Sequence, residues 1–336
     1  MKYIITGGAG FIGSILAQKL LQLQAKVCII DDLSTGHIRN IRHLLSYPGC
    51  KFIRGDASLP ATWDGLACSG DVIIHLAATV GVKKVCEDPF RTLENNIRGI
   101  ETVLEIALCS GCKVVYASSS EVYGQSESEA LKEEDALIVY AHQGGRSAYV
   151  LSKLMGEHYC FNYFEKYALP VIVCRFFNIA GINQSCSYGM VVPTFVQQAL
   201  NGQPITIFGD GEQRRSFCNV HDLTDALYAL MNQENTWGQA FNIGNTETIS
   251  INKLAEFVRH QTNNISSIVY EPLPYERCGG KDIHHRTPCI DKIKAATGWY
   301  PRIPWKQTVL DVLRHEKNNM QQPVNASQQH AQLVYG

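Results

Sequence analysis

Short apolar runs alternate with stretches of helical period along the first half of the chain. Each apolar run is bounded by glycine, proline or aspartate, as expected for strands that are buried on both faces. The runs that we predict as strands are Tyr3–Thr6, Val27–Asp31, Lys51–Arg54, Val72–Leu76, Lys113–Ser118 and Val171–Phe176. Apolar residues recur at helical spacing in Phe11–Leu23, Asn95–Ser110 and Tyr149–Tyr167. The alternation predicts an α/β fold with a doubly wound parallel sheet, whose strands are linked by right-handed crossover helices.

The pattern changes after Asn178 to shorter, mixed elements. Helices are predicted at Val192–Leu200, Asp222–Asn232 and Ile251–Gln261, and strands at Ile205–Phe208 and Ala240–Ile243. We expect one domain over residues 1–177 and a smaller mixed α/β domain over 178–317, partly interleaved with the first, which suits a chain of 336 residues. Residues 318–336 are rich in Gln, Asn and Ser and lack a periodic apolar face, so a mobile tail is expected there.

Charge and cysteine content exclude several classes of function. Lys and Arg number 30 against 31 Asp and Glu, which gives a net charge of −1 and no basis for general attraction to nucleic acid or an anionic membrane. A strand begins at Tyr3, which leaves no room for a leader, and no apolar run approaches the roughly 18 residues of a membrane helix. We therefore expect a cytoplasmic protein. The 12 cysteines are scattered among apolar neighbours, and only Cys109-Ser-Gly-Cys112 has metal-like spacing, without a second pair, so no metal site is expected.

A glycine-rich turn joins the first predicted strand to the first predicted helix. Gly8-x-Gly10-x-x-Gly13 fits the dinucleotide-binding fingerprint, and Gly7-x-x-Gly10-x-x-Gly13 fits a variant spacing of the same loop. Glycines at these positions permit a tight turn and let backbone N–H groups at the helix N-terminus approach a pyrophosphate. The preceding strand and the following helix are the context in which this motif binds a dinucleotide.

Two aspartates at strand ends complete the prediction of a cofactor site. Asp31 ends the second strand, 18 residues after Gly13, where a carboxylate binds the adenosine ribose hydroxyls. The same carboxylate repels the 2′-phosphate of NADP, so the sequence favours NAD. Asp56 follows the third strand, where it can bond the adenine edge or simply cap its own strand.

Tyr149 and Lys153 predict a reaction centre beside this site. A separation of four residues puts both side chains on one face of a helix. A free tyrosine titrates near ~10, but a neighbouring ammonium and the positive charge of an oxidised nicotinamide both stabilise the phenolate. The tyrosine can then act as a base near neutral pH.

An ordered set of motifs extends this picture over almost the whole chain. It comprises Thr6-Gly-Gly-Ala-Gly-Phe-Ile-Gly13, Asp31-Asp-Leu-Ser-Thr-Gly36, His75-Leu-Ala-Ala78, Asn96-x-x-Gly99, Ser118-Ser-Ser-Glu-Val-Tyr-Gly124, Tyr149-x-x-x-Lys153 and Arg175-Phe-Phe-Asn178. In this order the motifs resemble the extended short-chain dehydrogenases that act on nucleotide sugars, nearest to the UDP-glucuronate 4-epimerases and the UDP-glucuronate decarboxylases. The resemblance runs from residue 3 to about 315. It implies a Rossmann domain followed by a nucleotide-sugar-binding domain, NAD as cofactor, a UDP-sugar or related nucleotide sugar as substrate, and a homodimer formed through the helices at 95–110 and 149–167.

The resemblance also implies a role for each matching residue. Tyr149 would take the proton from a sugar hydroxyl, while Lys153 would lower the pKa of Tyr149 and hold the nicotinamide ribose. Ser119 or Ser120 would bond the same sugar hydroxyl. The implied cofactor-binding residues are Gly7, Gly10, Phe11, Ile12, Gly13, Asp31, Asp32, Asp56, Ala57, Leu76, Ala77, Ala78, Asn96, Tyr149 and Lys153. The implied substrate-binding residues are Lys83, Asn178, Val192, Arg215 and Arg286.

Three reactions can follow oxidation of the sugar to a 4-keto intermediate. Our leading expectation is an NAD-dependent 4-epimerase of a UDP-hexose, UDP-hexuronate or UDP-N-acetylhexosamine, and a decarboxylase or dehydratase of the same family is the alternative. Glu121 resembles the acid/base that dehydratases and decarboxylases use at C5, yet some uronate epimerases carry the same Ser-Glu-Val-Tyr. Ser120 stands where many dehydratases have aspartate, which disfavours dehydration. Asn183 stands where uronate epimerases often have arginine, which favours a neutral sugar.

A protein that binds NAD without turnover, as a sensor or partner, is a separate class of function. The retention of Tyr149, Lys153 and the serine run argues against it, because a binding module has no use for a poised phenolate.

Overall fold

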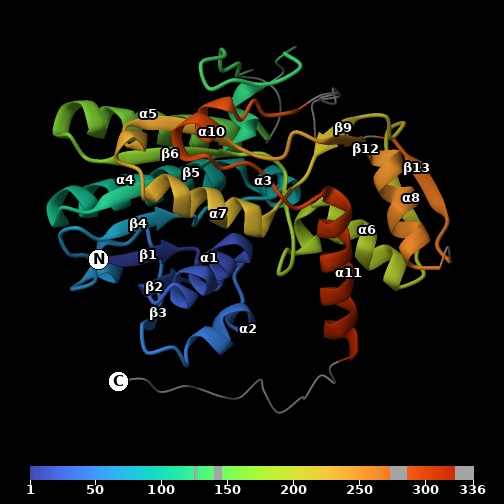
Figure 1. Cartoon of the computed structure of the whole chain (residues 1–336), viewed down its shortest axis with the longest axis horizontal. Helices are drawn as coiled ribbons and strands as arrows, with labels where there is room; N and C mark the ends of the chain where they lie inside the picture. Colours follow the sequence, from blue (N-terminus) through green and yellow to red (C-terminus); the bar gives the residue numbers. More distant parts are fainter. Residues whose placement is uncertain (125, 127, 140–145, 264, 273–285, 322–336) are drawn as a thin grey trace.

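The computed structural model describes residues 1–124, 126, 128–139, 146–263, 265–272 and 286–321, without the side chains of Val82, Lys83, Arg146 and Tyr188. Its main element is a parallel sheet of seven strands in the order β11-β6-β5-β4-β1-β2-β3 (Figure 1). The strands are β1 Lys2–Thr6, β2 Lys26–Asp31, β3 Cys50–Arg54, β4 Val72–His75, β5 Lys113–Ser119, β6 Val171–Phe176 and β11 Gln239–Ile243. The doubly wound α/β fold and the six strands predicted for the first half are confirmed.

Helices cover both faces of this sheet because successive strand residues point to opposite sides. Ile5 faces the side covered by α1 Phe11–Gln22 and α7 Val220–Met231, where it packs in one core with Leu16, Leu20, Leu223 and Leu227. Ile4 faces the other side, covered by α4 Pro89–Ser110 and α5 Arg146–Tyr167, and packs in a second core with Val103, Leu104 and Cys160. Each fully buried aliphatic side chain stabilises the fold by about 1.5–3 kcal/mol.

The N-terminus of α4 differs from the prediction. The helix begins at Pro89 and not at Asn95, because Asp88 Oδ1 accepts a hydrogen bond from Arg91 N at 2.9 Å and caps the first turn. Proline suits the first position of a helix, where an N–H group would have no partner. Several short elements were also not predicted: α2 Ile38–Ile41, α3 Val82–Glu87, α10 Asp291–Thr297, η1 Arg42–Leu44, η2 Pro60–Trp63, η3 Ser120–Tyr123, η4 Cys186–Tyr188 and η5 Glu234–Thr236.

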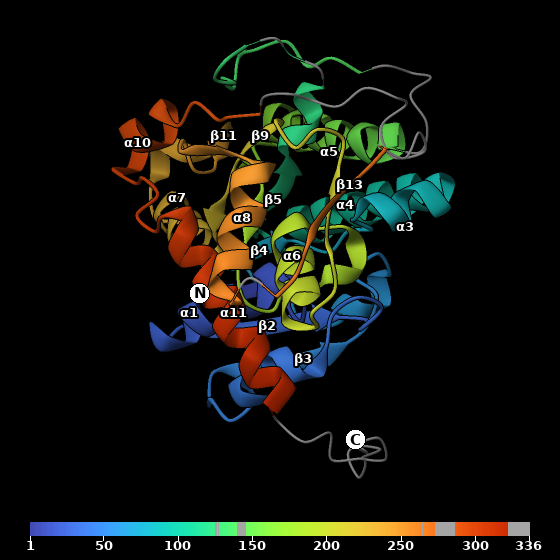
Figure 2. The same cartoon turned by 90° about the vertical axis from the view of Figure 1, so that its right-hand side faces the viewer.

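A smaller lobe, which we call the substrate lobe, lies beyond the carboxyl ends of the strands (Figures 1 and 2). Three strand pairs build it: β7 Ile179–Ala180 with β10 Cys218–Asn219, β8 Ile205–Phe208 with β13 Ile268–Glu271, and β9 Arg214–Ser216 with β12 Thr248–Ser250. Its helices are α6 Val191–Leu200, α8 Ile251–Gln261 and α11 Trp305–Gln321. A third core fills the lobe with residues such as Val196, Leu254 and Val309.

The two lobes are interleaved along the chain. The strand expected at Ala240–Ile243 lies within β11, which pairs with β6 at the edge of the main sheet. Phe241, Ile293 and Trp299 pack in the same core as Ile5, so the first lobe takes segments from well beyond residue 177. The expected tail is wrong at its start, because residues 318–321 continue α11, and residues 322–336 lie outside the described part. None of the described helices is long and apolar enough to span a membrane.

Candidate active site

The glycine loop brings β1 and α1 close together at one end of a cavity of about 420 Å³. Gly7 has φ of +68° and its N–H donates to Ile30 O at 2.8 Å. A Cβ atom on Gly13 would lie 2.4 Å from Gly7 O, so only glycine allows this approach. Gly10 precedes α1 without any side-chain cap, and Gly10, Phe11 and Ile12 line the cavity. An uncapped helix N-terminus facing a cavity fits the diphosphate of a dinucleotide.

Asp31 is held against this loop at the end of β2. Its Oδ2 accepts from Ala9 N at 2.9 Å and its Oδ1 accepts from Leu33 N at 2.8 Å. Burial raises the pKa of Asp31, and these two N–H groups act in the opposite direction. Asp32 and Asp56 are exposed and each accepts a backbone N–H two residues later, at 2.8 Å. These three aspartates line a smaller cavity of about 130 Å³ together with Ala57, which fits the adenosine end of NAD.

Tyr149 and Lys153 line the larger cavity from α5. Lys153 is buried, and its Nζ donates to Ala117 O at 2.7 Å and lies 5.8 Å from the centre of the Tyr149 ring. Burial lowers the pKa of Lys153 to about 8, while nearby Cys160 and Glu157 act to raise it. The structure therefore places this ammonium, held by a main-chain carbonyl, beside the phenol and on the same cavity as the glycine loop.

The three serines at the end of β5 and the start of η3 lie in different surroundings. Ser118 lines the cofactor cavity but donates its hydroxyl to Glu157, so it is tied into the core. Ser119 Oγ accepts from Glu121 N at 3.2 Å and caps η3. Ser120 is buried in the first position of that short helix. The sequence could not separate these roles, because the divergence follows from the turn into η3.

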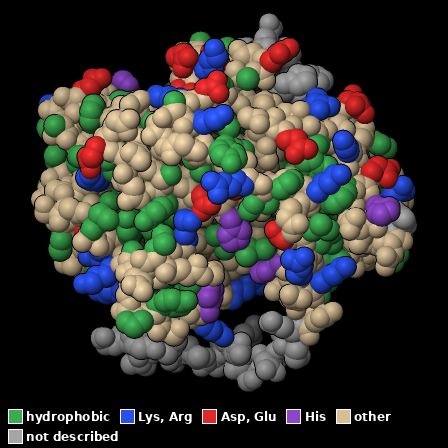
Figure 3. Space-filling view, viewed as in Figure 1, with side chains coloured by type: hydrophobic (Ala, Val, Ile, Leu, Met, Phe, Trp, Pro, Cys, Tyr) green, Lys and Arg blue, Asp and Glu red, His purple; other side chains and the backbone are tan. Residues whose placement is uncertain are grey.

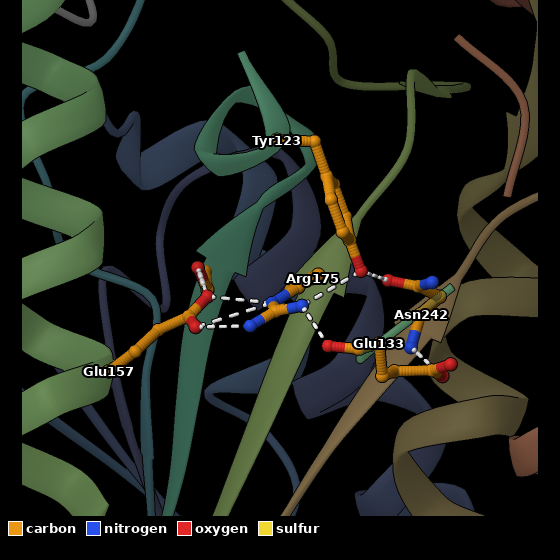
Figure 4. Close-up of polar contacts among 6 residues, drawn as sticks. Tyr123, Glu133, Glu157, Arg175 and Asn242 are labelled. Carbon is orange, nitrogen blue, oxygen red and sulfur yellow. Dashed lines mark hydrogen bonds and ion pairs between the residues drawn. The ribbon is translucent and has the colours of Figure 1, made fainter. Parts of the chain in front are cut away.

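A buried polar network links α5 to the elements around the serine turn (Figure 4). Glu157 lies one turn beyond Lys153 on α5 and binds Arg175 through two oxygens, at 2.7 Å to Nη2 and 3.0 Å to Nε. Arg175 Nη1 donates to Tyr123 OH at 2.8 Å and to Glu133 O at 3.0 Å. Tyr123 OH in turn donates to Asn242 Oδ1 at 2.7 Å. The network joins α5, β6, η3 and β11, so it fixes the helix that carries Tyr149 and Lys153 relative to the serine turn.

A second cavity of about 620 Å³ opens in the substrate lobe and shares Gln184 and Met190 with the first. Asn178, Val192 and Arg215, for which the resemblance implies substrate binding, line this cavity. Asn178 has φ of +40°, and its buried Nδ2 has no hydrogen-bond partner among the described residues. The buried Oε1 atoms of Gln184 and Gln213 likewise find no partner in the described part of the chain. Unpaired buried polar atoms around a cavity fit a polar ligand.

Glu121 and Arg286 form an ion pair across 165 residues of sequence. Both side chains are largely buried, with 18% and 6% of their surfaces exposed, and Glu121 lines the substrate cavity. Arg286 Nη1 holds the carboxylate, whereas Nη2 is buried with no partner in the ranges that the structure describes. One terminal nitrogen of the Arg286 guanidinium therefore binds Glu121, and only the other is available to a ligand such as a diphosphate.

Two more predicted residues are Asn96, which lines the smaller cavity, and Lys83, whose side chain cannot be placed. Asn96 Oδ1 accepts from Thr79 N at 2.7 Å, and its Nδ2 donates to Ser152 Oγ at 3.0 Å. It thereby positions the loop after β4, which carries Leu76, Ala77 and Ala78 to the cofactor cavity. Lys83 lies in α3, but its side chain is outside the described part. No group of His, Cys, Asp and Glu that could hold a metal occurs among the described residues.

Comparisons with known proteins agree with this geometry. A sequence profile of the NAD dependent epimerase/dehydratase family matches residues 3–244. The chain belongs to this family. NAD is accordingly its cofactor, and the glycine loop, the uncapped N-terminus of α1 and Asp31 are the features that fit it.

Individual relatives in this family carry different activities. The UDP-N-acetyl-alpha-D-glucosaminuronate decarboxylase of Bacillus cytotoxicus is 33% identical over 317 residues, which cover 93% of this chain and 97% of that protein. UDP-glucuronic acid decarboxylase 1 of Danio rerio is 31% identical, with 96% of this chain and 74% of that protein covered. The structure of UDP-glucuronic acid 4-epimerase from Bacillus cereus, with UDP-glucuronic acid and NAD, superposes with a TM-score of 0.84 at 27% identity, covering 95% of this chain and 100% of that one.

Proposed function

We propose that the protein is an NAD-dependent nucleotide-sugar 4-epimerase, acting on a UDP-hexose, UDP-hexuronate or UDP-N-acetylhexosamine. The observation that carries the proposal is the position of Tyr149 and Lys153 on the same cavity as the glycine loop, next to a second cavity with unpaired polar atoms. This arrangement provides a base, a site for NAD and room for a nucleotide sugar.

The proposed chemistry assigns one task to each group. Lys153, held by Ala117 O, keeps a positive charge near the Tyr149 ring and stabilises its phenolate. The phenolate takes the proton from the C4 hydroxyl of the sugar, and Ser119 or Ser120 bonds the same oxygen. When bound, NAD supplies the oxidant for C4 and later the reductant for the resulting ketone. Rotation of the 4-keto sugar before reduction inverts C4.

The charges around the substrate cavity favour a neutral sugar. Glu121 already occupies one nitrogen of Arg286, and Asn183 donates its Nδ2 to Ser14 Oγ at 3.2 Å. A sugar carboxylate would add a second negative charge beside Glu121, and an arginine is absent at residue 183. We therefore rank UDP-hexose and UDP-N-acetylhexosamine above a hexuronate.

Decarboxylation of a UDP-hexuronate is a second candidate, and one specific observation favours it. Arg286 Nη2 is buried and unpaired among the described residues, so it can donate to a sugar carboxylate while Nη1 holds Glu121. A carboxylate β to the C4 ketone leaves as carbon dioxide, its bonding electrons pass to the ketone oxygen as an enolate, and C5 then takes a proton. The decarboxylase relatives in Bacillus cytotoxicus and Danio rerio support this alternative.

Product analysis tests the proposal. Purified protein with NAD is incubated with UDP-glucose, UDP-N-acetylglucosamine, UDP-glucuronate and UDP-N-acetylglucosaminuronate, and products are identified by mass spectrometry and NMR. We expect an inverted C4 and unchanged mass. A product lighter by carbon dioxide would overturn the epimerase in favour of the decarboxylase, and loss of water would indicate a dehydratase. Tight NAD binding without conversion of any of these sugars would support the alternative that the protein binds NAD without turnover, as a sensor or partner.

We also propose a homodimer formed through α4 and α5. Apolar side chains remain exposed on these helices at Leu108, Met155, Phe164 and Tyr167, which supports a further apolar contact. Light scattering coupled to size exclusion should give the mass of two chains, and the mass of one chain would refute this part of the proposal.

A further inference from the structure

The far end of the chain forms one wall of the cofactor cavity. His315, Glu316 and Asn319 of α11 line the same cavity as the glycine loop, facing His37 and Arg39 of the α2 segment. Figures 1 and 2 show α11 running from the substrate lobe down beside the first lobe. Figure 3 shows histidine and basic side chains gathered on the face where α2 and α11 approach each other. The cavity for NAD is therefore bounded by both lobes.

The α2 side of this wall is fixed to the glycine loop. His37 N donates to Ala9 O at 3.0 Å, and Asn40 Nδ2 donates to the same oxygen at 2.9 Å. Asp31 holds the N–H of Ala9. All three hydrogen bonds involve Ala9 of the glycine loop. They therefore fix the backbone that carries Arg39 relative to the expected diphosphate site.

The α11 side is fixed to the substrate lobe. Thr308 Oγ1 bonds Asn219 Nδ2 at 3.1 Å, and Trp305 Nε1 donates to Glu247 Oε1 at 3.0 Å. The first half of the helix is buried in the core of that lobe through Trp305, Val309, Val312 and Leu313. The last two turns extend past this core and carry His315 to the cofactor cavity.

The groups that meet there suit an anion with hydroxyls beside it. Arg39 brings a permanent positive charge. Burial lowers the pKa of the half-buried His315, Glu316 acts to raise it, and nearby Arg39 lowers it further. The imidazole of His315 can donate an N–H, and Glu316 supplies an acceptor. The diphosphate and the adenosine ribose of NAD present the matching charge and hydroxyls.

We propose that Arg39 and His315 bind the diphosphate and adenosine ribose of NAD from the two lobes, so that the substrate lobe helps to retain the cofactor between turnovers. Such retention matters for a reaction that oxidises and then reduces the same sugar. If the reduced cofactor dissociates after the first step, the keto sugar cannot be reduced. The proposal concerns NAD alone and holds for whichever sugar reaction the enzyme performs.

Release of NAD from full-length protein tests this. Wild type, Arg39→Gln, His315→Gln and the double variant are loaded with NAD, freed of excess, and followed for nucleotide release into a large volume of buffer. We expect the double variant to release NAD at least tenfold faster than wild type, with the single variants in between. Added salt should speed release from wild type more than from the double variant, because it screens Arg39.

Lys317→Gln is the matched control. Lys317 is exposed on the same helix and does not line the cavity, so this variant should release NAD at the wild-type rate. Equal release from wild type and the double variant would overturn the proposal, provided that the NAD-free proteins melt at the same temperature. Equally fast release from Lys317→Gln would also overturn it, because the effect would then follow from net charge and not from the cavity wall.

Discussion

Glu157 Oε2 and Arg175 Nη2 lie 2.7 Å apart in a pair whose side chains are only 3% and 5% exposed. Glu157 is on the helix that carries Tyr149 and Lys153, and Arg175 is on β6, next to the strand that leads into Ser119. The pair therefore sets the distance between the proposed base and the serine turn. Because it is buried, removal of one partner leaves a charge that water cannot reach.

Glu157→Gln should destabilise the protein strongly. The change leaves the Arg175 guanidinium buried without its counter-charge, and a cost of about 3–5 kcal/mol is expected for this. Urea unfolding gives the free energy of unfolding. The control is Glu256→Gln, which removes a surface pair with Arg259 and should cost at most about 1 kcal/mol. Similar losses for both variants would show that the buried pair has no special role.

Tyr149→Phe should abolish most turnover and leave NAD binding nearly intact. The substitution keeps the ring and removes the only atom that can take the proton, so kcat should fall by about 10²-fold or more. Steady-state kinetics and the amount of NAD bound to the purified variant measure the two effects. Unchanged turnover would remove Tyr149 from the mechanism.

The activity should fall on the alkaline side of about pH 8, where Lys153 loses its proton. The lysine pKa in the folded protein is below its ordinary value, so the cation that stabilises the phenolate is present below about 8 and lost as pH rises through it. Lys153→Arg should retain some activity and lack this alkaline limb, because arginine stays protonated. A kcat/KM profile against pH compares the two, and an identical limb in both would exclude Lys153 as its origin.

NAD should bind more tightly than NADP because Asp31 stands at the ribose end of the site. Its carboxylate is fixed by Ala9 N and Leu33 N and cannot turn away from a 2′-phosphate. We expect a difference of about tenfold or more, equivalent to roughly 1.4 kcal/mol, measured by calorimetry. Asp32→Asn, at the exposed neighbouring carboxylate, should alter this ratio less. Equal affinities in wild type would contradict the assigned ribose contact.

Glu121→Gln separates the two candidate reactions. A 4-epimerase needs only rotation of the ketone, so the variant should retain substantial interconversion of its substrate. A decarboxylase that uses Glu121 at C5 should instead stall after oxidation, with the absorbance of bound NADH rising. In both cases the variant loses the charge that pairs with Arg286, so an NAD-binding measurement is needed to show that the site remains assembled.

The strands of the sheet could be predicted from the sequence because each of them follows a local pattern, whereas their order in the sheet comes from the structure. The strands are short, largely apolar runs with glycine, proline or aspartate near at least one end. The start of α4 was missed although Asp88-Pro89 is a helix-start signal, because the polar residues near Asn95 interrupt the apolar period. The last turns of α11, residues 314–321, are polar apart from Met320, so no periodic apolar face predicted their helical form.

Three parts of the site could also be predicted from the sequence: the glycine loop, Asp31 and the Tyr149–Lys153 pair. Each of them requires fixed residue types at a fixed sequence spacing. The pairing of Glu121 with Arg286 was not, because it joins segments 165 residues apart through the fold. Gln184 and Gln213 were missed for the same reason: an unpaired buried oxygen is a property of the cavity wall and has no signature in sequence.

The place of β11 at the edge of the main sheet has a consequence for how the chain folds as it is synthesised. Until Gln239–Ile243 has left the ribosome, β6 keeps an open edge, and Trp299, which packs in the same core as Ile5, is made later still. The first lobe cannot complete its native packing while the substrate lobe is still being translated. A fragment that stops at residue 177 would expose an unpaired strand and an apolar sheet face, which are the features that drive aggregation of nascent chains.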